Sequence, residues 1–239
     1  MTTRTQTPPA QLTLPGQTAT PAGPLDMTGM YLAHHAFRRD LAAFAAAVPR
    51  TPVEDRRTWA ALAARWTLFA EVLHHHHTGE DTGVWPALHE RVDAAGAETL
   101  DAMEAEHAVI DPLLEACASG LRTLLRRPDS DVRAALAVRL VAARERLGEH
   151  LRHEETGAIP LLQQHLSPQE WTAIQEEHFH PARTLRQLAV LVPWLLEGVP
   201  DDAVRDLASR PGNTPMRVLW TLSRGRFARR SRAAFRYAG

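Results

Sequence analysis

The sequence contains no lysine, so arginine carries all 27 of its positive side-chain charges. These nearly balance 28 acidic residues, and a formal net charge of -1 leaves no overall field that would attract nucleic acid or a membrane surface. The single cysteine, Cys117, excludes an internal disulfide and fits a reducing compartment, so we expect a cytoplasmic protein. The apolar run Leu188–Leu196 falls well short of the about 20 residues that cross a bilayer, and we expect no transmembrane segment.

Only two tyrosines are present, whereas alanine and leucine are abundant, which favours helix over strand. Four long segments carry apolar residues at alternating steps of three and four, the pattern of amphipathic helices. The first begins near Met27, the second at a capping box over Thr51–Glu54, and the fourth near Asp129 or Ser130. Short connections predict an all-α fold, an up-down four-helix bundle over residues 26–166.

The two ends of the chain differ from the bundle in composition. Residues 1–25 are rich in Thr, Pro, Gln and Gly, and without an apolar run they predict a disordered arm rather than a signal peptide. Residues 167–239 predict a C-terminal helical extension that opens at a capping box over Ser167–Glu170. Its last segment is basic, and we interpret the arginines as a solvated face of a packed helix in preference to a membrane or nucleic-acid contact.

An internal repeat organises the predicted bundle. The stretch His74–Pro86 recurs as His150–Pro160, and aligning the two prolines superposes positions that lie 74 residues apart. The superposed pairs are His76 with His150, Glu80 with Glu154, Asp81 with Glu155, and the two Thr-Gly pairs. Each copy also has a lone histidine upstream, His34 lying 42 residues before His76 and His107 lying 43 before His150.

Six polar residues of this repeat occupy positions where the helical pattern calls for apolar ones. They are His34, His76, Glu80, His107, His150 and Glu154. Burying imidazoles and carboxylates without partners costs several kcal/mol each, and a bound metal offsets that cost most simply. Residues four apart project to one side of a helix, so two His-x-x-x-Glu pairs and two further histidines suit a dinuclear site. Imidazole with carboxylate fits iron, manganese or zinc, and the absence of thiolates argues against a structural zinc site.

The chain resembles the hemerythrin-like, HHE cation-binding family over about residues 25–165. The resemblance rests on His34-His35-Ala36-Phe37-Arg38-Arg39-Asp40-Leu41, on His76-x-x-x-Glu80 ahead of Trp85-Pro86, on Glu106-His107, and on His150-x-x-x-Glu154 ahead of Ile159-Pro160. It implies two iron ions with an oxo or hydroxo bridge and a coordination position open to O2, H2O2 or NO. Family members include O2 carriers, sensors of O2, NO or iron, and enzymes that consume peroxide or NO. The resemblance therefore leaves a peroxide- or NO-consuming oxidoreductase, a sensor and an iron-storage protein all open. The downstream Pro193–Gly198 and the arginine-rich end resemble an extension of bacterial members.

Hemerythrin itself uses five histidines and two carboxylates, and this chain departs from that set. The third helix offers only His107, with Asp111 where a second histidine would fall. His77 is the main candidate for a seventh ligand; Asp111, Tyr31, water or an exogenous ligand are the others. The fourth helix has Leu151 at the place matching His77, so the two metals would differ in coordination. A DinB-like bundle with a single metal is the structural alternative, and the doubled His-x-x-x-Glu pair argues against it.

The other polar residues near the repeat have simpler interpretations. Asp81 and Glu155 either orient ligating histidines or form salt bridges with arginine. Four further histidines fall off the helical stripes and are expected at the solvated surface: His35, His74, His75 and His153.

Overall fold

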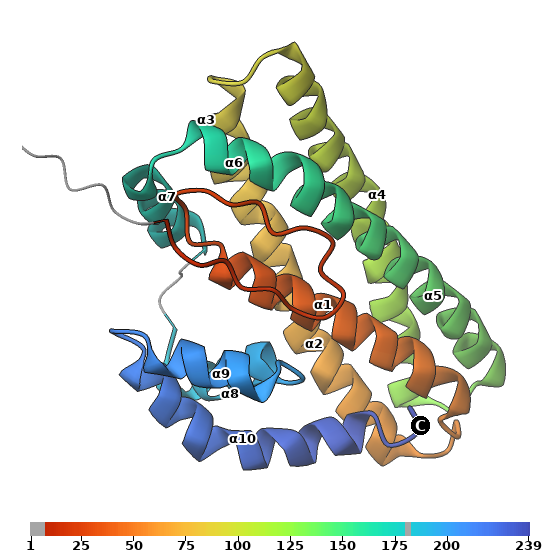
Figure 1. The fold of residues 1–239 in the computed structure, drawn as a ribbon. Helices are drawn as coiled ribbons and strands as arrows, with labels where there is room; N and C mark the ends of the chain where they lie inside the picture. Colours follow the sequence, from red (N-terminus) through yellow and green to blue (C-terminus); the bar gives the residue numbers. More distant parts are fainter. Residues whose placement is uncertain (1–7, 180–182) are drawn as a thin grey trace, which may run out of the picture.

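The computed structural model describes residues 8–179 and 183–239, and every regular element in those ranges is helical. Four long helices run alternately up and down, as Figure 1 shows. They are α1 (Thr28–Ala47), α2 (Arg56–Gly79), α4 (Ala94–Arg126) and α5 (Ser130–His153). Helix α1 contacts α2 and α5, and α4 contacts the same two helices, so the four close into a ring. The predicted all-α four-helix bundle is confirmed.

Helix α2 begins later than its predicted capping box. The backbone N–H and the hydroxyl of Thr51 both donate to the carbonyl of Ala47, so Thr51 ends the preceding turn, the 3-10 helix η1 (Val48–Arg50), and does not cap the next helix. Asp55 caps α2 instead, because its Oδ1 accepts from the N–H of Thr58 at 3.1 Å.

Two π-helical turns interrupt the bundle at equivalent places in the repeat. Helix α2 continues through η2 (Glu80–Val84) into α3 (Trp85–His89), and α5 continues through η3 (Glu154–Ala158) into α6 (Ile159–His165). Each π turn ends two residues before a proline, Pro86 or Pro160, whose missing N–H and bulky ring disfavour a regular α-helical turn. Both turns begin at the glutamate of the repeated motif, so the two glutamates occupy matching positions.

The apolar core is divided into two clusters along the bundle. On α2 and its continuation, Leu73 belongs to one cluster and Val84 to the other. On α4, Ile110 and Met103 are divided in the same way. The polar residues singled out by the repeat lie between these positions, so they form a layer that separates the two clusters.

The segment before α1 differs from the predicted disordered arm. Residues 8–25 lie along α1 and the α5–α6 side of the bundle (Figure 1), with Leu12, Leu14 and Leu25 buried. The amide group of Gln163 holds Leu25 through both its backbone N–H and its carbonyl. Three leucines spaced through a polar stretch were too sparse to register as an apolar run, yet they bury against the bundle. Residues 1–7 of the predicted arm lie outside the described residues.

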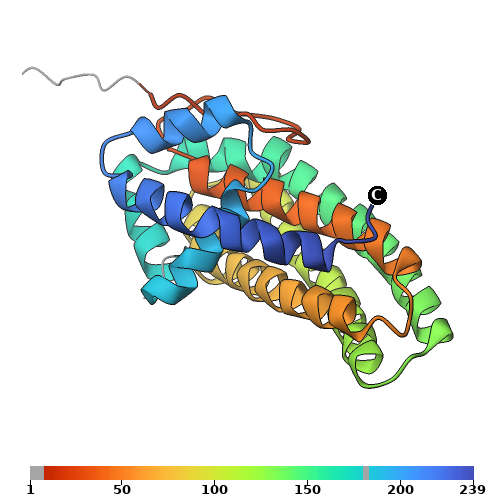
Figure 2. The same cartoon turned by 90° about the horizontal axis from the view of Figure 1, so that it is seen from below.

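The C-terminal extension covers the α1–α2 side of the bundle, as Figures 1 and 2 show. Its elements are α7 (Pro168–Ile174), η4 (Gln175–Phe179), α8 (Leu185–Leu196), α9 (Asp201–Ser209) and α10 (Thr214–Ala234). The capping box predicted at Ser167 is present. A second capping box, at Thr184, starts α8, so the extension begins a new helix there.

A buried ion-pair network joins the extension to the bundle. Asp40 accepts hydrogen bonds from Arg65 at 2.6 and 2.7 Å and from the indole N–H of Trp194 at 2.9 Å. Arg39 donates to Asp40 and to the carbonyl oxygens of Trp194 and Glu197. These charges hold the pKa of Asp40 below its ordinary value despite its burial, so the network keeps the carboxylate ionised.

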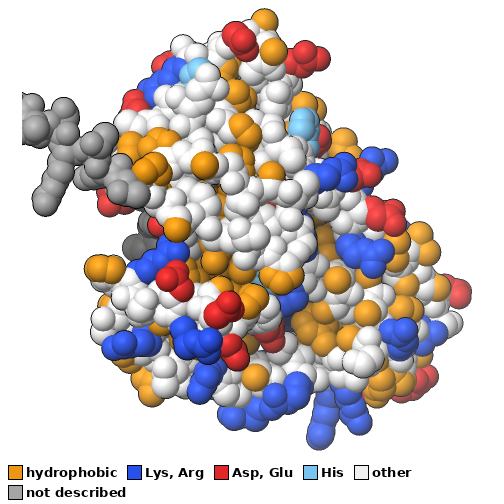
Figure 3. Space-filling model, viewed as in Figure 1, with side chains coloured by type: hydrophobic (Ala, Val, Ile, Leu, Met, Phe, Trp, Pro, Cys, Tyr) orange, Lys and Arg blue, Asp and Glu red, His pale blue; other side chains and the backbone are white. Residues whose placement is uncertain are grey.

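The basic face of α10 points to solvent. Seven arginines on and after this helix are exposed, and Figure 3 shows positive side chains along the edge that α10 forms. The aromatic side turns inward, where the Arg65 guanidinium lies 4.8 Å from the ring centre of Phe227 and 5.5 Å from that of Phe235. Among the described residues, no helix is both long enough and apolar enough to span a bilayer.

Candidate metal centre

The first group of donors comes from α1, α2 and the π turn η3 that continues α5. His34, His76 and Glu154 each place one ligand atom within 4.8 Å of the others. The Nε2 atom of His34 lies 3.1 Å from Oε2 of Glu154. The two imidazoles meet edge to face with ring centres 5.3 Å apart. All three side chains are buried, so the group forms an enclosed set of two nitrogens and one carboxylate.

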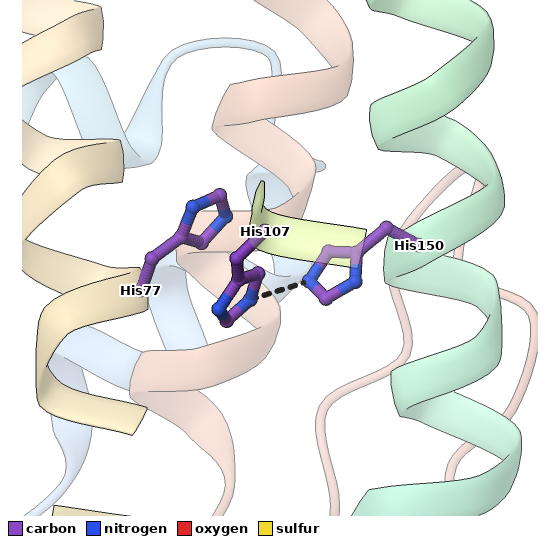
Figure 4. A group of neighbouring side chains, drawn as sticks. All are labelled: His77, His107 and His150. Carbon is purple, nitrogen blue, oxygen red and sulfur yellow. Dashed lines mark hydrogen bonds between the residues drawn. The ribbon is translucent and has the colours of Figure 1, made fainter. Parts of the chain in front are cut away.

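The second group consists of His77, His107 and His150, from α2, α4 and α5 (Figure 4). The rings of His77 and His107 stack with centres 3.9 Å apart. The Nε2 atoms of His107 and His150 lie 3.2 Å apart. Because the Nδ1 atom of each ring faces a carboxylate at 2.8 Å, the proton of the neutral ring belongs on Nδ1. Two bare nitrogens then face each other, an arrangement that a shared cation would stabilise.

The two glutamates connect these groups. Oε1 of Glu80 lies 3.1 Å from Nε2 of His76, and its Oε2 lies 3.6 Å from Nε2 of His107. Oε2 of Glu154 lies 3.1 Å from His34 and 4.0 Å from Nε2 of His150. Glu80, His150 and Glu154 also form a third set of converging donors. Each carboxylate therefore reaches both groups, as a bridge between two cations would require.

Further carboxylates hold the outer nitrogens of the histidines. Asp81, from the first copy of the repeat, lies 2.8 Å from Nδ1 of His107. Glu155, from the second copy, lies 3.0 Å from Nδ1 of His34 and also accepts from Arg38 at 2.7 Å. Both interpretations of these acids thus hold for Glu155, which orients a histidine and pairs with an arginine. Fixing the proton on Nδ1 leaves Nε2 free to bind a metal.

Glu106 is a further residue of the centre, and sequence reasoning assigned it no role. Its two oxygens lie 2.8 Å from Nδ1 of His150 and 2.8 Å from Nδ1 of His153. It directly precedes His107 in the sequence, so it lies on the same helix turn and reaches across to α5. The sequence shows that Glu106 is adjacent to His107, but it does not show which neighbouring helix the Glu106 side chain faces.

The converging atoms lack other partners. Among the described residues, seven buried atoms that face the interior of the centre have no hydrogen bond: Nε2 of His34, His76 and His77, and all four carboxylate oxygens of Glu80 and Glu154. Nδ1 of His77 is an eighth such atom, and it faces Asp111 at 3.5 Å. Both glutamates are 0% exposed. A buried charge without a partner costs several kcal/mol. Imidazole nitrogens and carboxylate oxygens aimed at one interior fit metal cations, which would satisfy all of these atoms together.

Burial and neighbouring charges shift the protonation of the centre. Burial lowers the pKa of His34, but the carboxylates of Glu154 and Glu155 outweigh it and raise this pKa to about 9. Burial and the adjacent Glu154 carboxylate raise the pKa of Glu80 well above its ordinary value. Burial lowers the pKa of His77 to about 4, so this imidazole is neutral at physiological pH. Before a cation binds, protons on His34 and Glu80 compensate the buried negative charge.

All seven sequence-predicted site residues come together in the structure, and His77 lies with His107 and His150. Asp111 belongs to none of the donor groups found among the described residues, and its Oδ1 lies 3.5 Å from Nδ1 of His77. Tyr31 is buried, and its hydroxyl has no hydrogen-bond partner in the described part of the chain. Burial and the charges of Glu155 and Glu154 raise the pKa of Tyr31, which keeps the phenol protonated.

The four histidines predicted at the solvated surface lie outside the donor groups. His35 is buried at 8% exposure beside Pro15 and Gly198, so its predicted surface position is wrong. His74 is exposed, as predicted. His75 and His153 are half-buried and hydrogen-bonded to Phe179 and Glu106, respectively.

A helical bundle with groups of His and Glu side chains in its interior is typical of a bundle-type metal-binding protein. The family model described as the hemerythrin HHE cation-binding domain matches residues 28–162, and the chain therefore belongs to this family. A search of the curated proteins and a search of the solved structures found no match. The match spans all four bundle helices and every residue of the donor groups.

Proposed function

We propose that the centre holds two iron ions and binds or redox-processes a small ligand, O2, H2O2 or NO. The observation that carries this proposal is the pair of buried glutamates, each of which reaches both histidine groups. Five imidazoles and two carboxylates form a donor set that suits iron, with manganese or zinc as substitutes. A single-metal site of the DinB-like kind gives no reason for both glutamates to lie between two histidine groups.

The unequal division of histidines supports an open position for the small ligand. Three imidazoles gather on one side, whereas only His34 and His76 lie on the other. The side with two protein nitrogens leaves more room for an exogenous ligand. The bound metal pair would supply the redox chemistry and the ligand position. The chain itself supplies the fixed tautomers, through Asp81, Glu106 and Glu155, and the buried positions of the two glutamates.

Metal analysis of the purified protein, combined with optical spectra of anaerobic and aerated samples, tests this proposal. We expect two irons per chain and a spectrum that changes on exposure to O2, peroxide or NO. Glu80→Ala and Glu154→Ala should each lower the iron content below one per chain, because each removes a ligand shared by both metals. Glu145→Ala, an exposed acid on α5, is the matched control and should retain both irons.

One iron per chain in the wild type, or unchanged iron in both glutamate variants, contradicts the proposal. Steady-state consumption of peroxide or NO by the two-iron protein would identify an oxidoreductase. A reversible ligand spectrum with negligible turnover would identify a carrier or sensor.

A further inference from the structure

The repeat relates the two halves of the centre, but one histidine lacks the partner that its counterpart has. In the second copy, Nδ1 of His150 faces Glu106, the residue that precedes His107. The equivalent residue in the first copy precedes His34 and is Ala33. His76 is the counterpart of His150, and no described residue hydrogen-bonds its Nδ1. The first half of the centre therefore has a methyl group where the second half has a carboxylate.

A cavity of about 510 Å³ lies next to Ala33 and His76, and both residues form part of its wall. Its volume falls within the range of about 300–1,000 Å³ of small-molecule sites. Most of the wall is apolar and comes from Met30, Val72, Leu188, Leu191 and Leu195. The apolar cavity therefore borders one candidate metal ligand, His76.

The C-terminal extension forms the other wall of this cavity and packs directly on His76. The ring of Phe179 lies 6.1 Å from that of His76, centre to centre. A Cβ at Gly79 would lie 2.9 Å from Cζ of Phe179, and one at Gly83 would lie 2.5 Å from Cδ2 of His178. Gly83 has a counterpart in the second copy, but the place of Gly79 is taken there by His153. The close approach of the extension is therefore specific to the half that contains His76.

The polar part of the cavity wall favours an anion. It consists of His75, His76, Gln175 and Arg183, and no aspartate or glutamate of the described residues lines the cavity. Arg183 has no ion pair with any carboxylate of the described residues, and the residues outside that part of the chain contain no aspartate or glutamate. The guanidinium of Arg183 and the Nδ1 atom of His76, at an otherwise apolar wall, match a carboxylate attached to an apolar body, whereas His75 already bonds the carbonyl of Phe179.

We propose that this cavity binds a small monocarboxylate with an apolar body, whose carboxylate takes beside His76 the place that Glu106 takes beside His150. The proposal rests on the proposed function only for the role of His76 as a metal ligand. Such a ligand would complete the hydrogen-bonded surroundings of the metal centre on the side with fewer protein nitrogens. The extension thereby gives the centre a selective site for an organic acid.

Isothermal titration calorimetry with phenylbutyrate on the full-length protein tests this site. We expect one molecule bound per chain, and at least tenfold weaker binding of phenylbutanol, which keeps the apolar body but lacks the charge. Butyrate, which keeps the charge but lacks the ring, should also bind at least tenfold more weakly. Equal binding of the acid and the alcohol, or no binding of the acid at millimolar concentration, overturns the proposal.

Two variants locate the carboxylate. Ala33→Glu places an internal carboxylate beside His76 and should weaken phenylbutyrate binding more than tenfold, whereas Ala42→Glu, the same change at an exposed position of α1, should leave it unchanged. Arg183→Gln removes only the charge and should weaken binding by about tenfold, which keeps the test valid if Ala33→Glu does not fold. Unchanged affinity in Arg183→Gln and in folded Ala33→Glu contradicts the site.

The metal content of each sample separates this test from the test of the proposed function. Two irons per chain without phenylbutyrate binding overturns the carboxylate site alone. Phenylbutyrate binding by a protein that retains no iron overturns the proposed function alone.

Discussion

At the scale of single residues, each copy of the repeat fixes an imidazole of the other copy. Asp81 follows Glu80 yet holds His107 on α4, and Glu155 follows Glu154 yet holds His34 on α1. The two halves of the centre therefore interlock through their outer carboxylates. A defect in one copy should weaken the ligand that the other copy supplies.

Removing these outer carboxylates should lower metal affinity without removing a ligand. We expect Asp81→Ala and Glu155→Ala each to weaken metal binding about 10–100-fold, because the histidine loses the partner that sets its tautomer and ring orientation. Competition against a chromophoric chelator measures the affinity. Glu71→Ala, at an exposed acid of α2, is the control and should match the wild type. Wild-type affinity in both Asp81→Ala and Glu155→Ala would contradict this role.

At the scale of elements, the π turn η2 and the C-terminal extension meet on one side of the bundle. The turn η2 begins at Glu80 and contains Gly83, whose missing side chain admits the ring of His178 from η4. The same turn that carries a candidate metal ligand thus receives the extension. The packing of η4 and the position of Glu80 are therefore connected through three residues of backbone.

Two glycine substitutions distinguish the effect of helix propensity on stability from the effect of packing η4 against the bundle. In Gly148→Ala on α5, the added Cβ has no atom of the described residues within 4 Å, and the substitution should raise the free energy of unfolding by roughly 0.5–1 kcal/mol. Gly83→Ala should give no such gain, because its Cβ would lie 2.5 Å from the ring of His178. Chemical unfolding measures both changes, and hydrogen exchange should show faster exchange in α7 and η4 for Gly83→Ala only. Equal stabilisation by the two substitutions would show that η4 does not depend on this glycine.

At the scale of the whole molecule, a polar layer separates two apolar clusters. Each cluster is closed by side chains from several helices, but the layer between them contains buried nitrogens and oxygens without partners. Bound cations would join all four helices at this level. Metal binding should therefore add to the stability of the whole bundle.

Metal binding should raise the Tm, and the metal affinity should depend on pH. At a free metal concentration 100-fold above the dissociation constant, binding adds about 2.7 kcal/mol, which corresponds to a Tm rise of about 5–10 °C for a chain of this size. Because the pKa of His34 is raised to about 9, the metal-free protein holds a proton there at pH 7 that the metal must displace. Affinity should therefore rise from pH 7 to about 9 and fall on acidification.

The stability of the metal-free protein should change with pH in the opposite direction to the metal affinity. The stability contributed by protonated His34 is fully present below its ordinary pKa of 6.5 and is lost as the pH rises through about 9. The difference in Tm between loaded and metal-free protein should therefore widen with pH over this range. Calorimetric scans in the presence and absence of a chelator measure that difference, and a constant difference from pH 7 to 9 would contradict proton displacement from His34.

The sequence by itself determined the bundle and the donors that converge in it. Helical periodicity assigned His34, His76 and His107 to inward faces, and the repeat identified the glutamates that follow at fixed spacing. These features are local, since a spacing of three or four residues fixes which side of a helix a residue occupies. They predicted the order of the helices and six of the candidate ligands without any knowledge of how the helices meet, whereas His77 was added as a candidate by comparison with the hemerythrin ligand set.

Only the tertiary structure decided how these residues are shared and what surrounds them. The placement of His77 with His107 and His150, the reach of Glu106 to α5 and the cavity beside Ala33 depend on side chains from different helices meeting in space. The buried leucines of residues 8–25 and the docking of η4 at Gly83 likewise depend on contacts between distant segments. Periodicity gives the direction of a side chain around its own helix, but the neighbour it meets depends on how the helices pack.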